Sequence, residues 1–300
     1  MNAPQRPGPR RRAVPGRAWR AAGGGALAAH AVLRAVTTGR WESALRRTNF
    51  RGRTVSLAAG PALAIGAATA AASAAPSLPA GTAALVAGLG SGAVGLYDDV
   101  VGARPEQRAA KGFAGHLAAL RQRRITSGLV KIIGVGAAGL GAAALLAIDT
   151  TVRNHPARRR LGRAGTATDL LLGAGVIAGT ANLVNLLDLR PGRALKAGVL
   201  LGAPLARGPA AGLAAGPVGA AAALLPADLD EKVMLGDSGA NALGALLGVA
   251  LAARTGPLGR AAILGVVAAL TAASERISFT KVIQDTPGLR EFDELGRRPS

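Results

Sequence analysis

Residues Thr54 to Tyr97 form a run of 44 residues without a single charged side chain. One helix needs about 20 apolar residues to cross the hydrocarbon core of a bilayer, so this run is long enough for two crossings. The segment Pro76-Ser77-Leu78-Pro79 interrupts the run near its middle. The pattern predicts a helical hairpin in a membrane, and it excludes a small soluble domain.

The remaining apolar runs extend this prediction to the whole chain. Half of the residues are hydrophobic but only 2% are aromatic, and the mean hydropathy is +0.32. Ala and Gly supply most of the apolar character, and small residues let membrane helices pack closely. We predict an all-α polytopic membrane protein with about nine transmembrane helices, at residues 21–38, 54–76, 79–97, 125–148, 170–187, 197–206, 208–225, 238–259 and 261–274.

Three domains follow from the same pattern. Residues 1–20 are basic and proline-rich, which predicts a disordered N-terminal tail. Residues 21–275 form the transmembrane domain. Residues 276–300 alternate apolar and charged side chains around Pro287, which predicts a cytoplasmic segment with two short amphipathic helices at the membrane surface.

The charge distribution favours contact with lipid over contact with nucleic acid. The formal net charge is +20, and the basic residues lie in short segments between apolar runs. There they set topology and meet anionic lipid. No motif for binding RNA or DNA accompanies them, so we expect no nucleic-acid partner. The chain has no cysteine, which excludes disulfides and thiolate metal sites.

The acidic residues cluster in segments that the predicted helices place on one side. These segments are 40–53, 98–124, 188–196, 228–237 and 275–300. Counting Lys and Arg favours the cytoplasm for this side, with two conflicts: the basic tail and the five arginines between Arg153 and Arg163 fall on the opposite side. We expect a multi-pass protein of the cell membrane whose active site faces the cytoplasm.

Asp237 lies in the turn Gly236-Asp237-Ser238-Gly239, directly before a long apolar run. A carboxylate at the end of a membrane helix is unfavourable and usually has a function. Glycines let backbone amides approach an anion, and one carboxylate with substrate phosphates suits magnesium. The alternative is a helix cap made by Asp237 or Ser238.

Asp98 and Asp99 form a pair of like charges at the end of the third predicted span. Acids are unfavourable at a helix C-terminus, which favours a functional role as a base or as metal ligands. Lys111 and a group of arginines follow, and cations at a lipid interface suit phosphate groups. Ordinary loop acids and snorkelling cations are the alternative.

Asn182, Asn185 and Asp188 recur three residues apart at the end of the fifth predicted span. This spacing places them on one stripe of a helix. Polar side chains inside a membrane helix face protein or water, so the stripe predicts a binding site. The alternative is hydrogen bonding between helices.

The order of these motifs resembles a known superfamily. Residues 95–99, 182–188 and 235–248, with Asn49-Phe50-Arg51-Gly52-Arg53 and Gly60 ahead of them, are similar to the polyprenyl-phosphate N-acetylhexosamine-1-phosphate transferases. That superfamily includes phospho-MurNAc-pentapeptide translocase and undecaprenyl-phosphate GlcNAc-1-phosphate transferase. The resemblance covers roughly residues 45 to 295.

The resemblance implies transfer of a sugar-1-phosphate from a nucleotide sugar to a polyprenyl phosphate, with Mg²⁺ as cofactor. By the matching motifs, Asp237 would bind magnesium, and Asp98 and Asp99 would orient or deprotonate the acceptor phosphate. The residues that would bind substrate are Lys111, Asn182, Asn185, Asp188, Arg276 and Lys281. For the last two, an interfacial anchor is the alternative role. A homodimer is compatible with the sequence.

Two departures from the superfamily pattern favour a second hypothesis. Leu189 stands where a glycine usually follows Asp188, and the C-terminal segment lacks the usual histidines. A catalytically inactive relative that binds polyprenyl phosphate or scaffolds cell-wall enzymes is therefore the alternative. A small transporter is a third hypothesis, but inverted repeats are not evident. Retention of all the acidic motifs favours the transferase.

Overall fold

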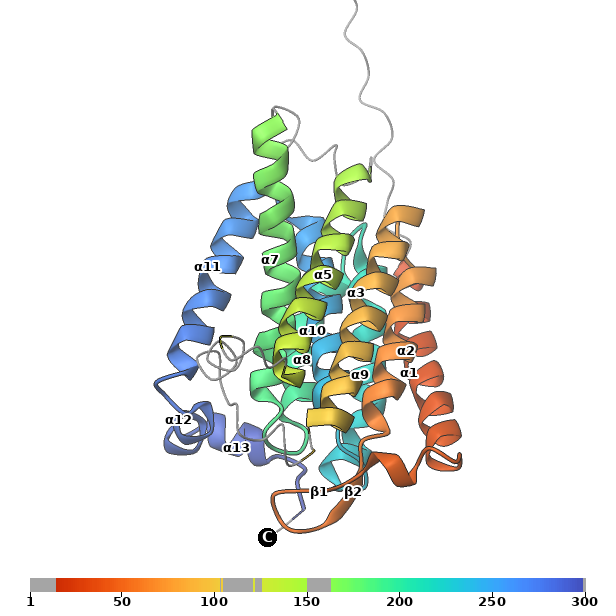
Figure 1. Cartoon of the computed structure of the whole chain (residues 1–300). Coiled ribbons are helices and arrows are strands. Elements are labelled where there is room, and N and C mark those ends of the chain that lie inside the picture. Colours follow the sequence, from red (N-terminus) through yellow and green to blue (C-terminus); the bar gives the residue numbers. More distant parts are fainter. Residues whose placement is uncertain (1–14, 103, 105–120, 122–125, 150–162, 299–300) are drawn as a thin grey trace, which may run out of the picture.

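The computed structural model describes residues 15–102, 104, 121, 126–149 and 163–298. These residues form a bundle of helices with one short hairpin (Figure 1). The long helices are α1 (Pro15–Thr37), α2 (Ala59–Ser73), α3 (Leu78–Tyr97), α5 (Ser127–Ile148), α7 (Arg163–Leu187), α8 (Arg193–Gly202), α9 (Ala211–Leu229), α10 (Gly236–Arg254) and α11 (Pro257–Ser274). The short helical segments are η1 (Ser43–Leu45), η2 (Asp98–Gly102), η5 (Pro204–Ala206), α12 (Phe279–Asp285) and α13 (Leu289–Glu294).

Within the described residues, five helical segments are long and apolar enough to cross a membrane. They are residues 78–102, 127–148, 164–187, 211–229 and 257–274. The chain is therefore a mostly helical protein with the features of a membrane protein. Each predicted span has a helix at its place, but nine crossings stay a prediction. At 1.5 Å per residue, α8 covers only about 15 Å, which is half of the hydrocarbon thickness.

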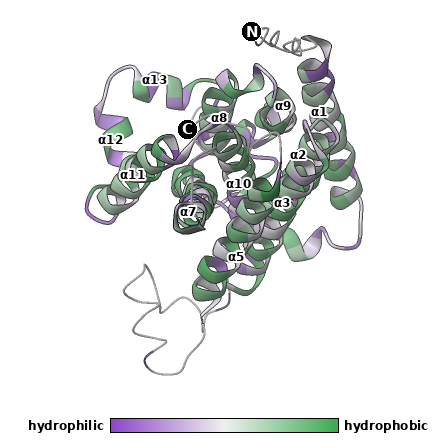
Figure 2. Ribbon diagram, turned by 90° about the horizontal axis from the view of Figure 1, so that it is seen from above, coloured by the Kyte–Doolittle hydropathy of each residue, from purple (hydrophilic) through white to green (hydrophobic). Residues whose placement is uncertain are grey.

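Helix α10 forms the centre of the bundle. Seen from above, it lies among α2, α3, α7, α8 and α9, and it contacts all five (Figure 2). Most of its residues are buried on every side. A helix covered all round needs no polar face, which explains the apolar sequence after Ser238. The neighbours present alanines to it, and these small side chains allow the close packing that the composition predicts.

Two sequence predictions need correction at their boundaries. The N-terminal tail was expected to be disordered to residue 20, but α1 already begins at Pro15, and Arg17 Nη2 donates to the carbonyl of Ala75 at 2.8 Å. This contact ties the first turn of α1 to the end of α2. Residues 1–14 lie outside the described part.

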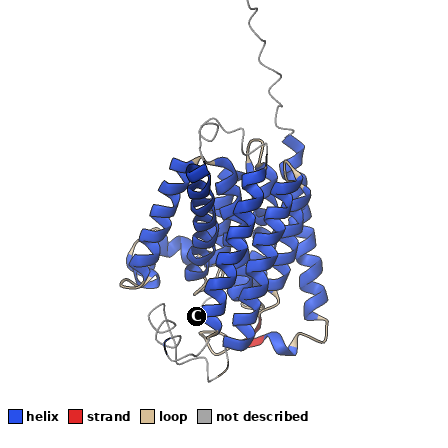
Figure 3. Cartoon of the chain, turned by 45° about the horizontal axis from the view of Figure 1, so that its top comes forward, coloured by secondary structure: helices blue, strands red, loops and turns tan. Residues whose placement is uncertain are grey.

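The first half of the predicted hairpin begins with a strand. Strand β2 (Thr54–Ser56) pairs antiparallel with β1 (Arg46–Thr48), so the chain is not purely α-helical (Figure 3). The turn between them forms because Asn49 Oδ1 accepts hydrogen bonds from the amides of Arg51 and Arg53. Side-chain amides that bond to backbone two residues ahead are typical of turns. The hairpin brings residues 49–53 to the end of the bundle where α3 and α7 finish.

The two ends of the bundle differ in chemistry, as the sequence predicts. The hairpin, η2, α12, α13 and the C-terminal end of the described chain gather at one end, which we call the acidic end (Figure 1). At the opposite end, the buried guanidinium of Arg260 in α11 donates to the carbonyls of Asp169 at 2.8 Å and of Ala252 at 2.7 Å. These bonds hold α11 against α7 and α10, since a buried charge requires partners.

Candidate functional site

Asp99 connects the first acidic motif to the third. It lies in η2, a π-helical turn that continues α3. Its Oδ1 accepts the amide of Asp237 at 3.0 Å, and its Oδ2 accepts the amide of Ser238 at 2.9 Å. The first amides of a helix have no partner within that helix, and a carboxylate stabilises this positive end. Asp99 therefore caps α10 from a different segment and fixes Asp237 beside it.

Glycines make this approach possible. A Cβ on Gly95 would lie 2.3 Å from the carbonyl oxygen of Asp237, and one on Gly236 would lie 3.0 Å from both carboxylate oxygens of Asp99. Gly236 also has a φ of +62°, which side chains rarely adopt. The sequence therefore needs glycine at both positions to bring α3, η2 and α10 together.

The close contact at Gly95 gives a testable prediction. Gly95→Ala should force α3 away from the start of α10 and lower the free energy of unfolding by about 1–3 kcal/mol, the usual effect of overpacking. Gly136→Ala in α5 is the matched control, because nothing lies within 4 Å of its Cβ position. The control should leave stability unchanged or raise it by up to about 1 kcal/mol. Thermal unfolding of both variants in the same detergent compares them, and equal melting temperatures would contradict the packing argument.

Lys131 provides the positive charge of the site. It projects from α5, and its Nζ lies 2.7 Å from Oδ2 of Asp98 and 2.6 Å from Oδ2 of Asp237. All three side chains are mostly buried. The ammonium thus bridges the first and third motifs and offsets the repulsion between their carboxylates. We call Asp98, Asp99, Lys131 and Asp237 the carboxylate cluster.

Asp188 brings the second motif to the same place. It follows the end of α7, and its carboxylate accepts the backbone amide of Gly236. Burial raises the pKa of Asp188 well above its usual value, and the charges of Asp228, Asp237 and Asp99 add to the rise. A raised pKa favours the neutral form of a carboxyl group, which can both donate and accept a hydrogen bond with a ligand. The three acidic motifs therefore converge, as their common side predicts.

The two asparagines of the second motif lie differently from Asp188. Asn182 Nδ2 donates to Oγ1 of Thr271 in α11 at 3.3 Å, which is the bond between helices that was the alternative to substrate binding. Asn185 has a buried Oδ1 that finds no hydrogen-bond partner within the described part of the chain. The two asparagines of the predicted stripe therefore have different roles: Asn182 joins two helices, and Asn185 is the better candidate for a contact with a ligand.

Of the predicted cations, Arg276 and Lys281 do not pair with the cluster. Lys111 lies outside the described residues. Arg276 and Lys281 are exposed on the C-terminal segment, and neither side chain forms a hydrogen bond or ion pair within the described ranges. Two short helices do flank Pro287 as predicted, but their place at the membrane surface stays a prediction.

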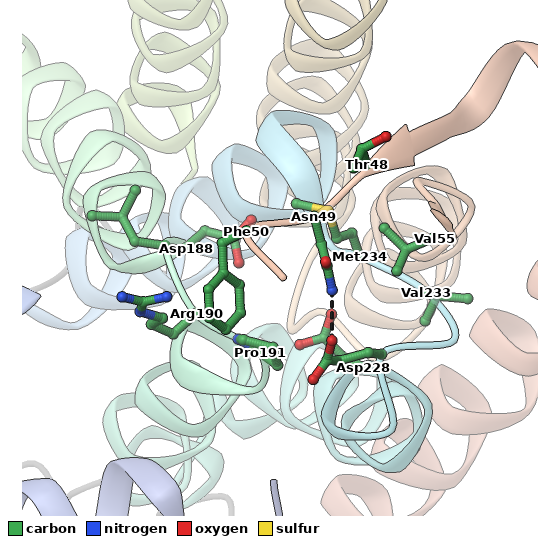
Figure 4. A pocket seen from close by; sticks show the side chains of 12 residues that line it. Thr48, Asn49, Phe50, Val55, Asp188, Arg190, Pro191, Asp228, Val233 and Met234 are labelled. Atoms are coloured by element: carbon green, nitrogen blue, oxygen red, sulfur yellow. Dashed lines mark hydrogen bonds between the residues drawn. The ribbon is translucent and has the colours of Figure 1, made fainter. Parts of the chain in front are cut away.

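A cavity of about 230 Å³ opens beside Asp188 (Figure 4). Three segments line it: the hairpin, the loop after α7 and the connection between α9 and α10. The lining residues are Thr48, Asn49, Phe50, Val55, Asp188, Leu189, Arg190, Pro191, Asp228, Glu231, Val233 and Met234. The guanidinium of Arg190 lies 4.1 Å from the centre of the Phe50 ring. An aromatic ring, a cation and several acceptors in one cavity are suited to a polar, partly planar ligand.

Glu231 holds the hairpin over this cavity. Its carboxylate accepts Asn49 Nδ2 at 2.6 Å and Arg51 Nη1 at 2.8 Å, and Figure 4 marks the first of these bonds. Glu231 has a φ of +53°, an uncommon backbone conformation for a residue with a side chain. Buried contacts at a strained residue are characteristic of functional regions.

The carboxylate cluster has the donor chemistry that magnesium requires. Mg²⁺ takes oxygen ligands and is usually bound by one or two carboxylates together with substrate phosphates. Asp98 and Asp237 direct oxygens to one position, where the Lys131 ammonium now lies. These two residues therefore fit a cation, although the described ranges contain no group of three or more His, Cys, Asp or Glu side chains that could hold a metal ion.

Comparison with known proteins gave no match to any family model and none to a curated protein.

Sequence reasoning missed the residues that complete the site. Lys131 is the only charge in an otherwise apolar span, and an isolated ionisable residue in a membrane helix is a usable signal. Asp228 and Glu231 belong to a segment that was recognised only as acidic. Their roles depend on contacts with Gly192 and Asn49, far away in the sequence, and no local pattern reveals these contacts.

Proposed function

We propose that the chain is a membrane-embedded transferase that moves a sugar-1-phosphate from a nucleotide sugar to a polyprenyl phosphate. One observation carries the proposal: at one end of a bundle of apolar helices, Asp98 and Asp237 pair with Lys131, while Asp99 and Asp188 accept backbone amides at the start of α10. Phosphoryl transfer requires mainly positioning and charge neutralisation, and this cluster offers both.

The proposed reaction is a displacement at phosphorus. An oxygen of the acceptor phosphate forms a bond to the sugar-bearing phosphorus, the diphosphate P–O bond breaks, and a nucleoside monophosphate leaves. Asp237 and Asp98 would hold Mg²⁺, which supplies neutralisation of phosphate charge when bound. Lys131 adds positive charge beside the same carboxylates.

The two adjacent acids take different parts in this proposal. Both oxygens of Asp99 accept backbone amides of α10, so Asp99 positions Asp237. Asp98 contacts the ammonium of Lys131, and beside its part in holding Mg²⁺ it would orient the acceptor phosphate. Asp188 and the cavity with Phe50 and Arg190 would receive the nucleoside part of the donor.

A direct assay tests the proposal. Purified protein is incubated with undecaprenyl phosphate, Mg²⁺ and a panel of radiolabelled nucleotide sugars, and extraction into butanol separates lipid-linked product. We expect label in the lipid with one donor and release of the matching nucleoside monophosphate. No labelled lipid with any donor would contradict the proposal.

The second candidate is an inactive relative that binds polyprenyl phosphate or scaffolds cell-wall enzymes. Lys131 already pairs with both Asp98 and Asp237, so a cation of the chain occupies the position between these two carboxylates without a ligand. The C-terminal segment also lacks histidine. Binding of undecaprenyl phosphate in nanodiscs, without product in the assay above, would favour this candidate.

The proposal requires the acidic end to face the cytoplasm, where nucleotide sugars are made. The chain has no native cysteine, so single cysteines can be labelled without background. Lys232→Cys lies at the acidic end and Arg207→Cys at the opposite end, and both side chains are exposed. A membrane-impermeant maleimide should label Arg207→Cys in intact cells and Lys232→Cys only after permeabilisation. The reverse pattern would contradict the orientation.

A further inference from the structure

Residues 289–298, which we call the C-terminal clasp, fold back onto the start of α8. Arg193 Nε and Nη2 lie 2.8 and 2.9 Å from the two carboxylate oxygens of Asp293, and both side chains are buried. Arg193 Nη1 also donates to Oγ1 of Thr280 in α12 at 2.9 Å. A two-pronged guanidinium–carboxylate pair fixes orientation as well as distance.

Lys196, one turn further along α8, makes a second attachment. Its ammonium donates to the carbonyls of Phe292, Asp293 and Leu295 at 2.8, 2.9 and 2.7 Å. The last carbonyls of a helix have no partner within that helix, so a single lysine caps the end of α13.

The third attachment reaches the loop that carries Asp188. Arg297 Nε donates to the carbonyl of Pro191 at 2.8 Å, and its Nη2 lies 2.6 Å from Oδ1 of Asp293. On the other side of this loop, the amide of Gly192 donates to the carboxylate of Asp228. Loop 188–193 is thus held between the clasp and the end of α9.

We propose that the clasp positions loop 188–193, with Asp293 as the positioning residue that acts through Arg193 and Arg297. Replacing a buried ion pair by apolar residues is often neutral or stabilising, so such a pair is weak as a device for stability alone. Here the two cations that bind the clasp from outside it, Arg193 and Lys196, lie within eight residues of Asp188, directly after the cavity-lining residues 188–191. The clasp therefore fixes the position of Asp188 and of the cavity-lining residues 189–191 relative to the carboxylate cluster. The consequence for donor binding rests on the proposed transferase function.

Asp293→Asn in the full chain tests the proposal, with Asp285→Asn as the matched control. The control makes the same change of charge in the same segment, at an exposed position. Hydrogen exchange of the loop 188–193 amides is the first readout. We expect exchange on the order of tenfold faster in Asp293→Asn, unchanged exchange in the control, and unchanged exchange in α10 of both variants.

Transfer from uridine diphosphate N-acetylglucosamine is the second readout. If loop 188–193 is displaced by about 1 Å in Asp293→Asn, kcat/KM should fall about 10–100-fold. The fall should come mainly from a higher KM for the donor, with the KM for undecaprenyl phosphate unchanged. Arg193→Lys keeps the charge but loses the two-pronged geometry, and it should show a smaller effect in the same direction. If the clasp only stabilised the fold, Asp293→Asn would not raise the KM for the donor while leaving the KM for undecaprenyl phosphate unchanged.

The outcomes separate the two proposals. Unchanged loop exchange in Asp293→Asn, or faster exchange confined to residues 289–298, would overturn the positioning role. If the wild-type protein transfers no sugar phosphate from any donor, the transferase proposal fails, and loop exchange by itself decides the role of the clasp.

Discussion

Replacing Asp237 by Asn is expected to reduce transfer on the order of a hundredfold or more, while the protein stays folded in the membrane. The carboxamide cannot supply the negative charge that magnesium requires, and the ion pair with Lys131 is also lost. Asp98 still contacts Lys131 in the variant, so the cluster keeps a neutralised pair. Initial rates of lipid-linked product formation at saturating donor measure the effect.

Asp230→Asn is the control for this change. Asp230 lies in the same connection between α9 and α10, but it is exposed and pairs with Lys232 at 2.6 Å. Exposed ion pairs contribute little, so this variant should keep activity within about twofold of the wild type. Full activity in Asp237→Asn would rule out the proposed metal role.

Lys131→Met should cause the largest loss of stability of any single substitution at the site. The side chain keeps its length, but Asp98 and Asp237 then face each other without a cation. Breaking a buried ion pair typically costs about 3–5 kcal/mol. Because Lys131 is 22% exposed and water screens part of the interaction, we expect a smaller loss of about 2–3 kcal/mol. Unfolding by SDS in mixed micelles, followed by circular dichroism, measures it.

Two further variants make this prediction specific. Lys232→Met removes an exposed cation from a pair with Asp230 and should change stability by less than about 0.5 kcal/mol. The double variant Lys131→Met with Asp98→Asn removes one of the opposing charges and should recover part of the loss. Additive losses in the double variant would show that the carboxylates are not coupled through Lys131.

Much of the architecture could be predicted from the sequence, because apolar length and charge position are local properties. The uncharged run from Thr54 to Tyr97 contains α2 and α3, which join at the prolines. The sequence also indicated that Asp98, Asp188 and Asp237 share one end. Successive membrane helices run in opposite directions, so every second connection lies on the same side. The hairpin at 46–56 was missed because its stability comes from an asparagine turn, which no apolar period reveals.

The pairing within the site was decided only by the tertiary structure. Nothing near Lys131 in the sequence indicates that its ammonium lies between Asp98 and Asp237, because this contact depends on how α3, α5 and α10 pack. The same holds for Arg193, which the resemblance left without a role and which the fold pairs with Asp293, 100 residues later. Hydropathy determines which segments are helices and where they end, since burial of apolar surface is non-directional. Ion pairs and caps need specific distances and angles, and these exist only after the helices have packed.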